Sequence, residues 1–171
     1  MKFEDLKLNH PFETDQTEFK EKLNKNDYFD WLKTICAFAN TKGGTLYVGV
    51  NDKTRELNGM TIDEVEREVN RLQSNDLAHL SPTVRLSFSY IDYLDGERKK
   101  WILEVDVPES YSKPVFMEYR GMATPFFRRE GVSSPSTIDE IRAMLVSYNS
   151  TSYDAFVSDI SYKKEDFGIL N

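Results

Sequence analysis

The chain has 171 residues, which fits one domain built around one substantial hydrophobic core. Hydrophobic residues make up 39% of the chain and aromatic residues 13%, a composition that excludes a low-complexity or disordered protein. The formal net charge of -7 excludes coating of nucleic acid through bulk positive charge, but it leaves room for a local basic face.

No apolar run approaches the roughly 18 residues of a membrane helix, and the N-terminus lacks a signal-peptide core. We therefore expect a soluble cytoplasmic protein without a membrane partner. Cys36 is the only cysteine, so an intramolecular disulfide is excluded, and its place on an apolar helix face predicts burial. His10 and His79 follow no ligand spacing, which gives a zinc site no support.

The first predicted elements are an arm and a strand. Residues 1–12 predict an extended arm or a short entry segment. Beyond it, Thr17 and Phe19 fit one face of a strand, and Glu18 and Lys20 then lie together on the other face.

A helix, a double-glycine turn and a strand follow. Asn26 and Asp27 are favourable N-cap residues for the helix. Apolar residues recur along it at helical spacing: Phe29, Leu32, Ile35, Cys36 and Ala39. Trp31 and Phe38 widen this apolar face, which predicts burial on more than one side. Gly43 and Gly44 suit the positive-φ conformations that a helix end and a sharp reversal require. The alternation of apolar residues over positions 45–50 then predicts a strand.

Turn and cap signals organise the rest of the chain. Thr61 and Glu64 form a capping box that predicts a second helix, and we interpret the charged face of that helix as solvated surface. The Asp95-Gly96 turn signal joins two alternating runs, so residues 83–107 predict a long antiparallel hairpin.

A second hairpin is predicted over residues 113–129, with its turn at Arg120-Gly121. Thr137 and Glu140 form another capping box, which predicts a final helix.

These signals predict one domain over residues 13–149, and residues 150–171 then form a tail or the beginning of a further region. The predicted fold class is α+β, with a mostly antiparallel sheet, two hairpins and about three packed helices.

Three motifs in this order resemble the Schlafen AlbA-type domain family. They are Glu13 with the triplet Glu18-Phe19-Lys20, the run ANTKGGTLYVGVND over residues 39–52, and the run FRREGVSS over residues 127–134. The family is also labelled a divergent AAA-type ATPase domain. The resemblance implies the α+β fold described above and a domain that binds nucleic acid, DNA or RNA, in a bacterial regulatory or defence-related protein.

Three carboxylates form the candidate catalytic set, Glu13, Glu18 and Asp52, with Lys20 close to Glu18. Converging carboxylates hold Mg²⁺ or Mn²⁺, which polarises a phosphate and lowers the pKa of an attacking water. The resemblance implies that this set matches the acidic residues of the family's RNA endonucleases. The alternative is that both glutamates are solvent-exposed and that Asp52 caps the local backbone.

Four basic residues and two glycines form the candidate nucleic-acid-binding set: Lys42, Gly43, Gly44, Arg120, Arg128 and Arg129, with Lys20 and Lys113 as further cations. The side chains would contact phosphate, and the N–H groups of the glycine turn could form an anion nest. Neighbouring aromatic residues could stack on unpaired bases or fill the core. In a strand, Arg128 and Arg129 point to opposite faces, so at most one faces a ligand and the other pairs with an acid such as Glu130.

Three sequence patterns of common enzyme classes are absent from the chain. The double-glycine turn lacks the GxxxxGK[ST] pattern that grips nucleotide phosphates, which argues against ATP hydrolysis. The GxSxG and GxGxxG patterns are absent as well. The sequence leaves open a nucleic-acid-binding domain, a metal-dependent endoribonuclease and a protein-interaction domain, with a homo-oligomer compatible with each.

Overall fold

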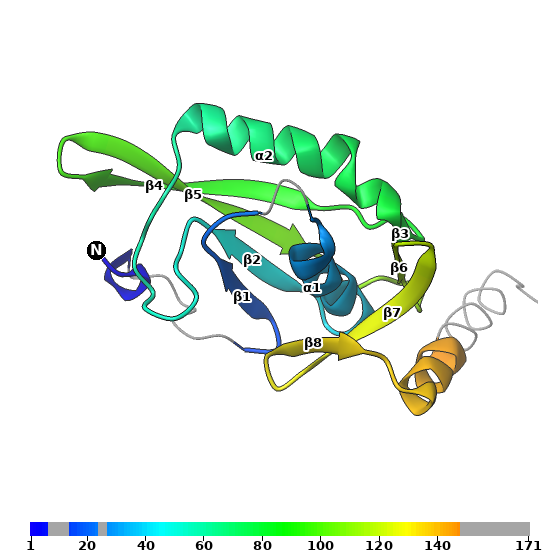
Figure 1. Ribbon diagram of the computed structural model, residues 1–171. Coiled ribbons are helices and arrows are strands. Elements are labelled where there is room, and N and C mark those ends of the chain that lie inside the picture. Colours follow the sequence, from blue (N-terminus) through cyan, green and yellow to red (C-terminus); the bar gives the residue numbers. More distant parts are fainter. Residues whose placement is uncertain (7–13, 24–26, 148–171) are drawn as a thin grey trace, which may run out of the picture.

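A computed structural model describes residues 1–6, 14–23 and 27–147 of the chain, whose strands form two four-stranded sheets (Figure 1). The first sheet has the strand order β1-β2-β5-β4 and contains β1 (Thr17–Lys20), β2 (Gly44–Val48), β4 (Ser87–Asp95) and β5 (Arg98–Val107). The second sheet has the order β3-β6-β7-β8 and contains β3 (Leu80–Ser81), β6 (Phe116–Tyr119), β7 (Met122–Arg129) and β8 (Val132–Pro135).

Strand pairing is antiparallel except between β1 and β2, which run parallel. The predicted α+β class and the two predicted hairpins, β4–β5 and β6–β7, are confirmed. The strands are divided between two sheets, where the sequence predicted one. The sequence also did not predict β8, which pairs with β7 across the Glu130-Gly131 turn, because its short run ends in proline.

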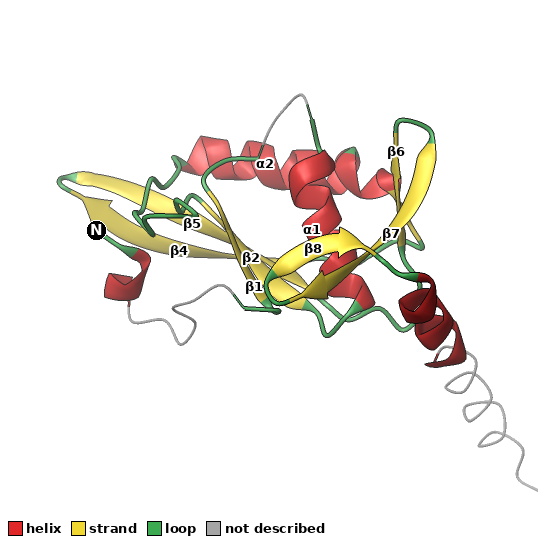
Figure 2. Cartoon of the chain, turned by 60° about the horizontal axis from the view of Figure 1, so that its bottom comes forward, coloured by secondary structure: helices red, strands yellow, loops and turns green. Residues whose placement is uncertain are grey.

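Helix α1 (Phe29–Asn40) lies between the two sheets (Figure 2). It packs against β7 of the second sheet and against β2 and β5 of the first. Nine of its twelve residues are buried, which explains why its apolar pattern is wider than one helix face. The N-cap of α1 is Tyr28, which makes no side-chain cap bond, so the predicted cap at Asp27 is one residue too early. The Asp27 Oδ1 still accepts a hydrogen bond from the Phe29 N–H at 2.9 Å, and Asn26 lies outside the described residues.

Both predicted capping boxes are present. At the start of α2 (Ile62–Ser74), the Thr61 N–H donates to the Glu64 carboxylate and the Glu64 N–H donates to the Thr61 hydroxyl. Thr137 and Glu140 make the same reciprocal pair at 2.8 and 3.2 Å before the helix over residues 138–147. Two short 3₁₀ helices, η1 (Phe3–Leu6) and η2 (Asp76–His79), complete the helical elements of the described chain.

Strand β1 separates apolar from charged side chains as predicted. Phe19 packs against the Tyr47 ring on one face of the sheet, and the buried Phe3 of η1 contacts both rings. Residues 3–6 thus form a short helix where the sequence predicted an extended arm. Glu18 and Lys20 lie on the other face, because their register partners in β2 belong to the core that surrounds α1. Two charged residues are therefore positioned at the edge of the face that α1 covers.

The double-glycine turn joins the end of α1 to β2. Gly43 adopts a φ of +73°, and its N–H donates to the Phe38 carbonyl at 2.9 Å, which closes the helix end as predicted. A Cβ atom at Gly43 would lie 2.6 Å from the carbonyl oxygen of Val107 in β5. Both the conformation and the space therefore require glycine at this position.

We predict that Gly43→Ala destabilises the domain by more than Gly96→Ala does. Both positions have a positive φ, but nothing lies within 4 Å of a Cβ atom at Gly96. We expect a loss of ~1 kcal/mol for Gly96→Ala from backbone conformation alone, and a further ~1–3 kcal/mol for Gly43→Ala from the contact with Val107. Urea denaturation of the two variants measures the difference, and equal losses would contradict the steric explanation.

Candidate nucleic-acid interface

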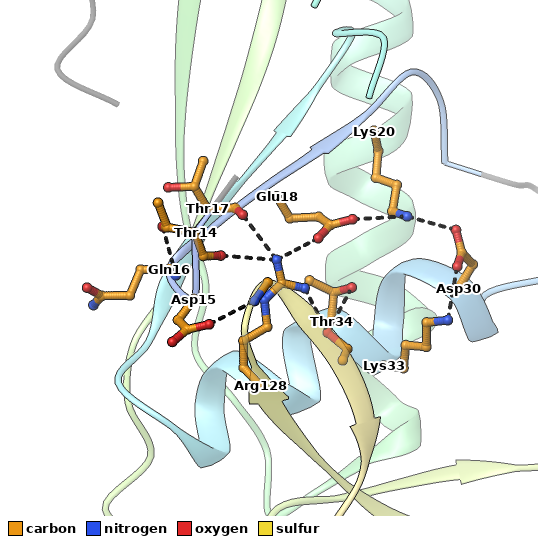
Figure 3. A network of polar contacts seen from close by, with 12 residues as sticks. Thr14, Asp15, Gln16, Thr17, Glu18, Lys20, Asp30, Lys33, Thr34 and Arg128 are labelled. Atoms are coloured by element: carbon orange, nitrogen blue, oxygen red, sulfur yellow. Dashed lines mark hydrogen bonds and ion pairs between the residues drawn. The ribbon is translucent and has the colours of Figure 1, made fainter. Parts of the chain in front are cut away.

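A chain of charged side chains runs from the edge strand β1 to the first turn of α1 (Figure 3). Lys20 Nζ lies 3.2 Å from Glu18 Oε1 and 3.0 Å from Asp30 Oδ2, and Lys33 Nζ lies 3.2 Å from Asp30 Oδ1. Burial lowers the pKa of Lys20, but Asp30 and Glu18 outweigh it, so that pKa lies above its ordinary value. Burial raises the pKa of Asp30, yet hydrogen bonds from Lys20 and Lys33 bring it below its ordinary value. Lys20 is thus held as a cation between two acids.

Arg128 of β7 is buried and reaches β1 from the second sheet (Figure 3). Its Nη2 lies 2.7 Å from Glu18 Oε2 and donates to the carbonyl oxygens of Thr14 and Thr17 at 3.2 and 3.1 Å. Its Nη1 donates to the Ser133 hydroxyl at 3.0 Å. With its side chain 1% exposed, Arg128 joins the two sheets and presents no phosphate-binding surface in this conformation. This burial argues against its predicted contact with a ligand.

The candidate metal ligands can be placed in part. Both carboxylate oxygens of Glu18 contact cations, Lys20 and Arg128, and Asp52 is exposed in the turn after β2. Glu13 lies outside the described residues. Within the described ranges, no group of three or more His, Cys, Asp or Glu side chains could hold a metal ion. Because Glu13 is one of the three predicted ligands, the three-carboxylate centre for Mg²⁺ or Mn²⁺ stays a prediction.

The predicted anion nest loses donors, because backbone N–H groups at the turn already donate to carbonyl oxygens of the protein. The Gly43 N–H donates to Phe38, and the Thr45 N–H beyond the turn donates to the Gln16 carbonyl at 2.8 Å. Gly44 is closely packed, since a Cβ atom there would lie 2.7 Å from the Phe38 ring. The two glycines serve helix termination and close packing, so a phosphate would meet side chains here more readily than backbone donors.

Arg129 and Arg120 occupy different ends of β7. Arg129 forms a two-pronged ion pair with Glu140 in place of the predicted Glu130, and this hydrogen bonding lowers the pKa of Glu140. Arg120 is exposed in the β6–β7 turn, where its guanidinium lies 5.0 Å from the centroid of the Tyr119 ring. Tyr119 packs near the start of α1, so Arg120 is roughly a helix length, ~18 Å, from the end of α1. The predicted basic residues do not form one patch.

Lys42 lies at the mouth of a cavity of about 570 Å³ beside the α1–β2 turn. Its side chain is exposed and forms no ion pair with a described residue. Lys113 also lines this cavity, but its Nζ is engaged by the Thr41 carbonyl at 3.0 Å and by the carboxylate of Glu109. Of the predicted cations at this end of the molecule, Lys42 is the one whose charge is not neutralised.

Sequence similarity to known proteins agrees with this arrangement of motifs. The family described as Schlafen, AlbA_2 matches residues 13–137, most of the chain. The chain belongs to this family. An uncharacterized ATP-binding protein of Ureaplasma parvum serovar 3 is 34% identical over 65 residues, which cover 38% of this chain and 17% of that protein. The match therefore spans a small part of the relative's length.

Two solved structures are similar to this AlbA_2 domain. The crystal structure of the DIP2311 protein from Corynebacterium diphtheriae has a TM-score of 0.46 and 18% identity, covering 71% of this chain and 22% of that one. The solution structure of the N-terminal domain of a protein from Nitrosomonas europaea, named as ATP-dependent DNA helicase RecG-related, has a TM-score of 0.45 and 22% identity. That match covers 78% of this chain and 92% of the other. In the AlbA_2 domain described here, no helix of the described residues is long and apolar enough to cross a membrane.

The AlbA_2 motif contains a residue that sequence reasoning did not select. Asn40, at the end of α1, is buried, and its Nδ2 donates to the carbonyl oxygens of Val115 and Phe126 at 2.8 and 2.9 Å. Its Oδ1 accepts from the Val115 N–H at 2.7 Å. One side chain thus joins α1 to β7 and to the segment before β6. The only sequence signal was an amide residue at the end of a long apolar helix.

Proposed function

We propose that this AlbA_2 domain binds nucleic acid through the surface around the α1–β2 turn. Membership of the family supports the proposal. The observation that carries it is Lys42, an exposed cation at the mouth of a cavity whose other cations are held by acids. An exposed ammonium group of this kind binds a phosphate oxygen and releases a counterion.

The expected binding is moderate and sensitive to salt. The net charge of -7 repels polyanions at long range, and few unpaired cations lie at this surface. The name of the Ureaplasma relative mentions ATP binding, but this chain has no GxxxxGK[ST] pattern, so phosphate contacts to a polynucleotide are the better supported alternative.

We predict that Lys42→Ala weakens binding to a labelled single strand roughly tenfold, because a hydrogen bond to a charged group contributes ~1.5–3 kcal/mol. The slope of log K against log salt should also become shallower by about one unit, since one phosphate contact is lost. Fluorescence anisotropy over a series of salt concentrations measures both quantities with RNA, single-stranded DNA and duplex DNA.

Lys53→Ala is the matched control. Lys53 is also exposed but lies in the turn beyond the opposite end of β2, and it carries the same charge. Equal losses for Lys42→Ala and Lys53→Ala would assign the effect to net charge and contradict a site at the α1–β2 turn.

The endoribonuclease alternative is tested in the same samples. Cleavage of RNA that requires Mn²⁺ or Mg²⁺ and disappears in Glu18→Gln, while circular dichroism shows that the variant is folded, would make the binding proposal incomplete. The ion pairs of Glu18 with Lys20 and Arg128 favour binding without cleavage.

A further inference from the structure

The cavity beside the α1–β2 turn has the size of a ligand site. Its volume of about 570 Å³ falls within the range of ~300–1,000 Å³ that is usual for small-molecule pockets. It lies between the turn, the end of β7 and the helix over residues 138–147. Asp15, Gln16, Glu109 and Lys113 complete the lining of this open cavity.

The cations that line this cavity are paired with acids, with the exception of Lys42. Lys113 pairs with Glu109, and Arg128 pairs with Glu18. Glu140, which also lines the cavity, is held by Arg129 outside it. Lys42 remains as the cation available to an anionic group that enters. An anionic group of a ligand would therefore lie at Lys42 and away from the Asp15 carboxylate, which also lines the cavity.

One wall of the cavity is apolar. Phe127 from β7 and Ala143 and Met144 from the final helix contribute to it. An aromatic ring and a thioether favour contact with a flat, polarisable group such as a nucleobase. Ala143 has the smallest of these side chains and is exposed, so it leaves the space open from the helix side.

Two residues at the edge of the cavity retain hydrogen-bond acceptors. Asp15 Oδ1 accepts from the Gly131 N–H at 2.8 Å, and no other contact of its carboxylate with a described residue is present. Gln16 Nε2 donates to the Lys42 carbonyl at 3.2 Å, which leaves the amide oxygen of Gln16 as an acceptor. Acceptors at this position favour a base that carries an exocyclic amino group.

We propose that this cavity binds a single unpaired nucleotide, with the base against Phe127 and the phosphate at Lys42, and with a preference for bases that carry an exocyclic amino group. The inference rests on the proposed function and names the part of the nucleic acid that is bound. A strand presents a single nucleotide of this kind only where a base is unstacked. A free nucleoside monophosphate offers the same chemistry, and the experiment below separates these two sources.

The test compares cytidine with uridine, two nucleosides of similar size whose bases carry an amino group and a carbonyl oxygen, respectively, at the same ring position. Cytidine and uridine monophosphates are titrated into ¹⁵N-labelled protein, and oligo-dC and oligo-dT are titrated by anisotropy. We expect shifts in the amide signals of Lys42, Phe127 and Ala143, and about tenfold tighter binding of the cytidine ligands.

Ala143→Phe fills the cavity and should weaken binding of cytidine monophosphate at least tenfold. Val146→Phe is the control, because Val146 is exposed on the same helix and does not line the cavity. Circular dichroism checks the fold of both variants, and Ala143→Leu provides the same test with a smaller side chain if the Phe variant does not fold.

The outcomes separate the cavity from the general function. Oligo-dC binding that is unchanged in Ala143→Phe, with no shifts from the monophosphate, would overturn the cavity proposal and leave nucleic-acid binding intact. Monophosphate binding that Ala143→Phe removes, without any binding of oligonucleotides, would support the cavity as a site for free nucleotides and overturn the proposed function. Equal affinity for cytidine and uridine would overturn the amino-group preference.

Discussion

Asn40→Asp is expected to destabilise the domain by ~3–5 kcal/mol at neutral pH, a large part of the ~5–15 kcal/mol that stabilises a typical domain. The substitution preserves size but replaces the amide nitrogen, which donates to Val115 and Phe126, with an oxygen that faces their two carbonyl oxygens. The site is 1% exposed, so water cannot compensate. Urea denaturation followed by circular dichroism measures the loss.

The pH dependence identifies the cause of this loss. A buried carboxyl group near two carbonyl oxygens has its folded-state pKa raised above the unfolded value of ~3.9, since its neutral form can still donate one hydrogen bond. The folded state then binds the proton more tightly, so the stability deficit should shrink as the pH falls from 7 toward 5 and grow as it rises.

Asn70→Asp provides the control for Asn40→Asp, because Asn70 is exposed on α2. It should change stability by less than ~0.5 kcal/mol. A similar loss in both variants, or a deficit at Asn40 that does not depend on pH, would show that its hydrogen bonds do not hold α1 to the second sheet.

The second large effect is expected at the ion pair between the two sheets. Arg128→Met should cost ~3–5 kcal/mol, because it breaks a buried ion pair and removes the donor of three further hydrogen bonds. Glu18 is 13% exposed and retains Lys20, while the carbonyl oxygens of Thr14 and Thr17 lose a donor. Denaturant unfolding of Arg128→Met, Glu18→Gln and the double variant measures the coupling.

The double variant should lose less free energy of unfolding than the two single variants together, because each single change already breaks the pair. We expect a difference of ~0.5–3 kcal/mol. Arg142 and Asp139 form the control pair, because their side chains are 74% and 93% exposed and lie 3.6 Å apart. Their coupling should be close to zero. Additive losses of stability in the Glu18 and Arg128 variants would instead show that the two residues are not coupled. Glu18 would then be available for another role, such as that of a metal ligand.

Several elements could be predicted because their signals are local. The capping boxes at Thr61 and Thr137 and the glycine turn at Gly43 depend on hydrogen bonds and dihedral angles within a few residues. The alternation in β4 and β5 and the Asp95-Gly96 turn likewise predicted the long hairpin. The family motifs could be identified in order for the same reason, since each one is a short run.

The roles of the candidate site residues could not be predicted in this way. Alternation correctly placed Arg128 and Arg129 on opposite faces of a strand, but it could not say which face is buried. Arg128 bonds to Thr17, 111 residues earlier in the chain, and Asn40 bonds to Val115, 75 residues later. No sequence pattern within either segment identifies these distant partners.

The sequence by itself determined the order of the helices and strands apart from β8, the two capping boxes and the hairpin turns, and the family to which the chain belongs, because these depend on short-range preferences. Only the tertiary structure decided that Arg128 joins two sheets, that Glu18 is held between two cations, and that Lys42 stands at the mouth of a cavity. The physical reason is that burial and charge pairing depend on which distant segments pack together, and that packing is set by the whole chain.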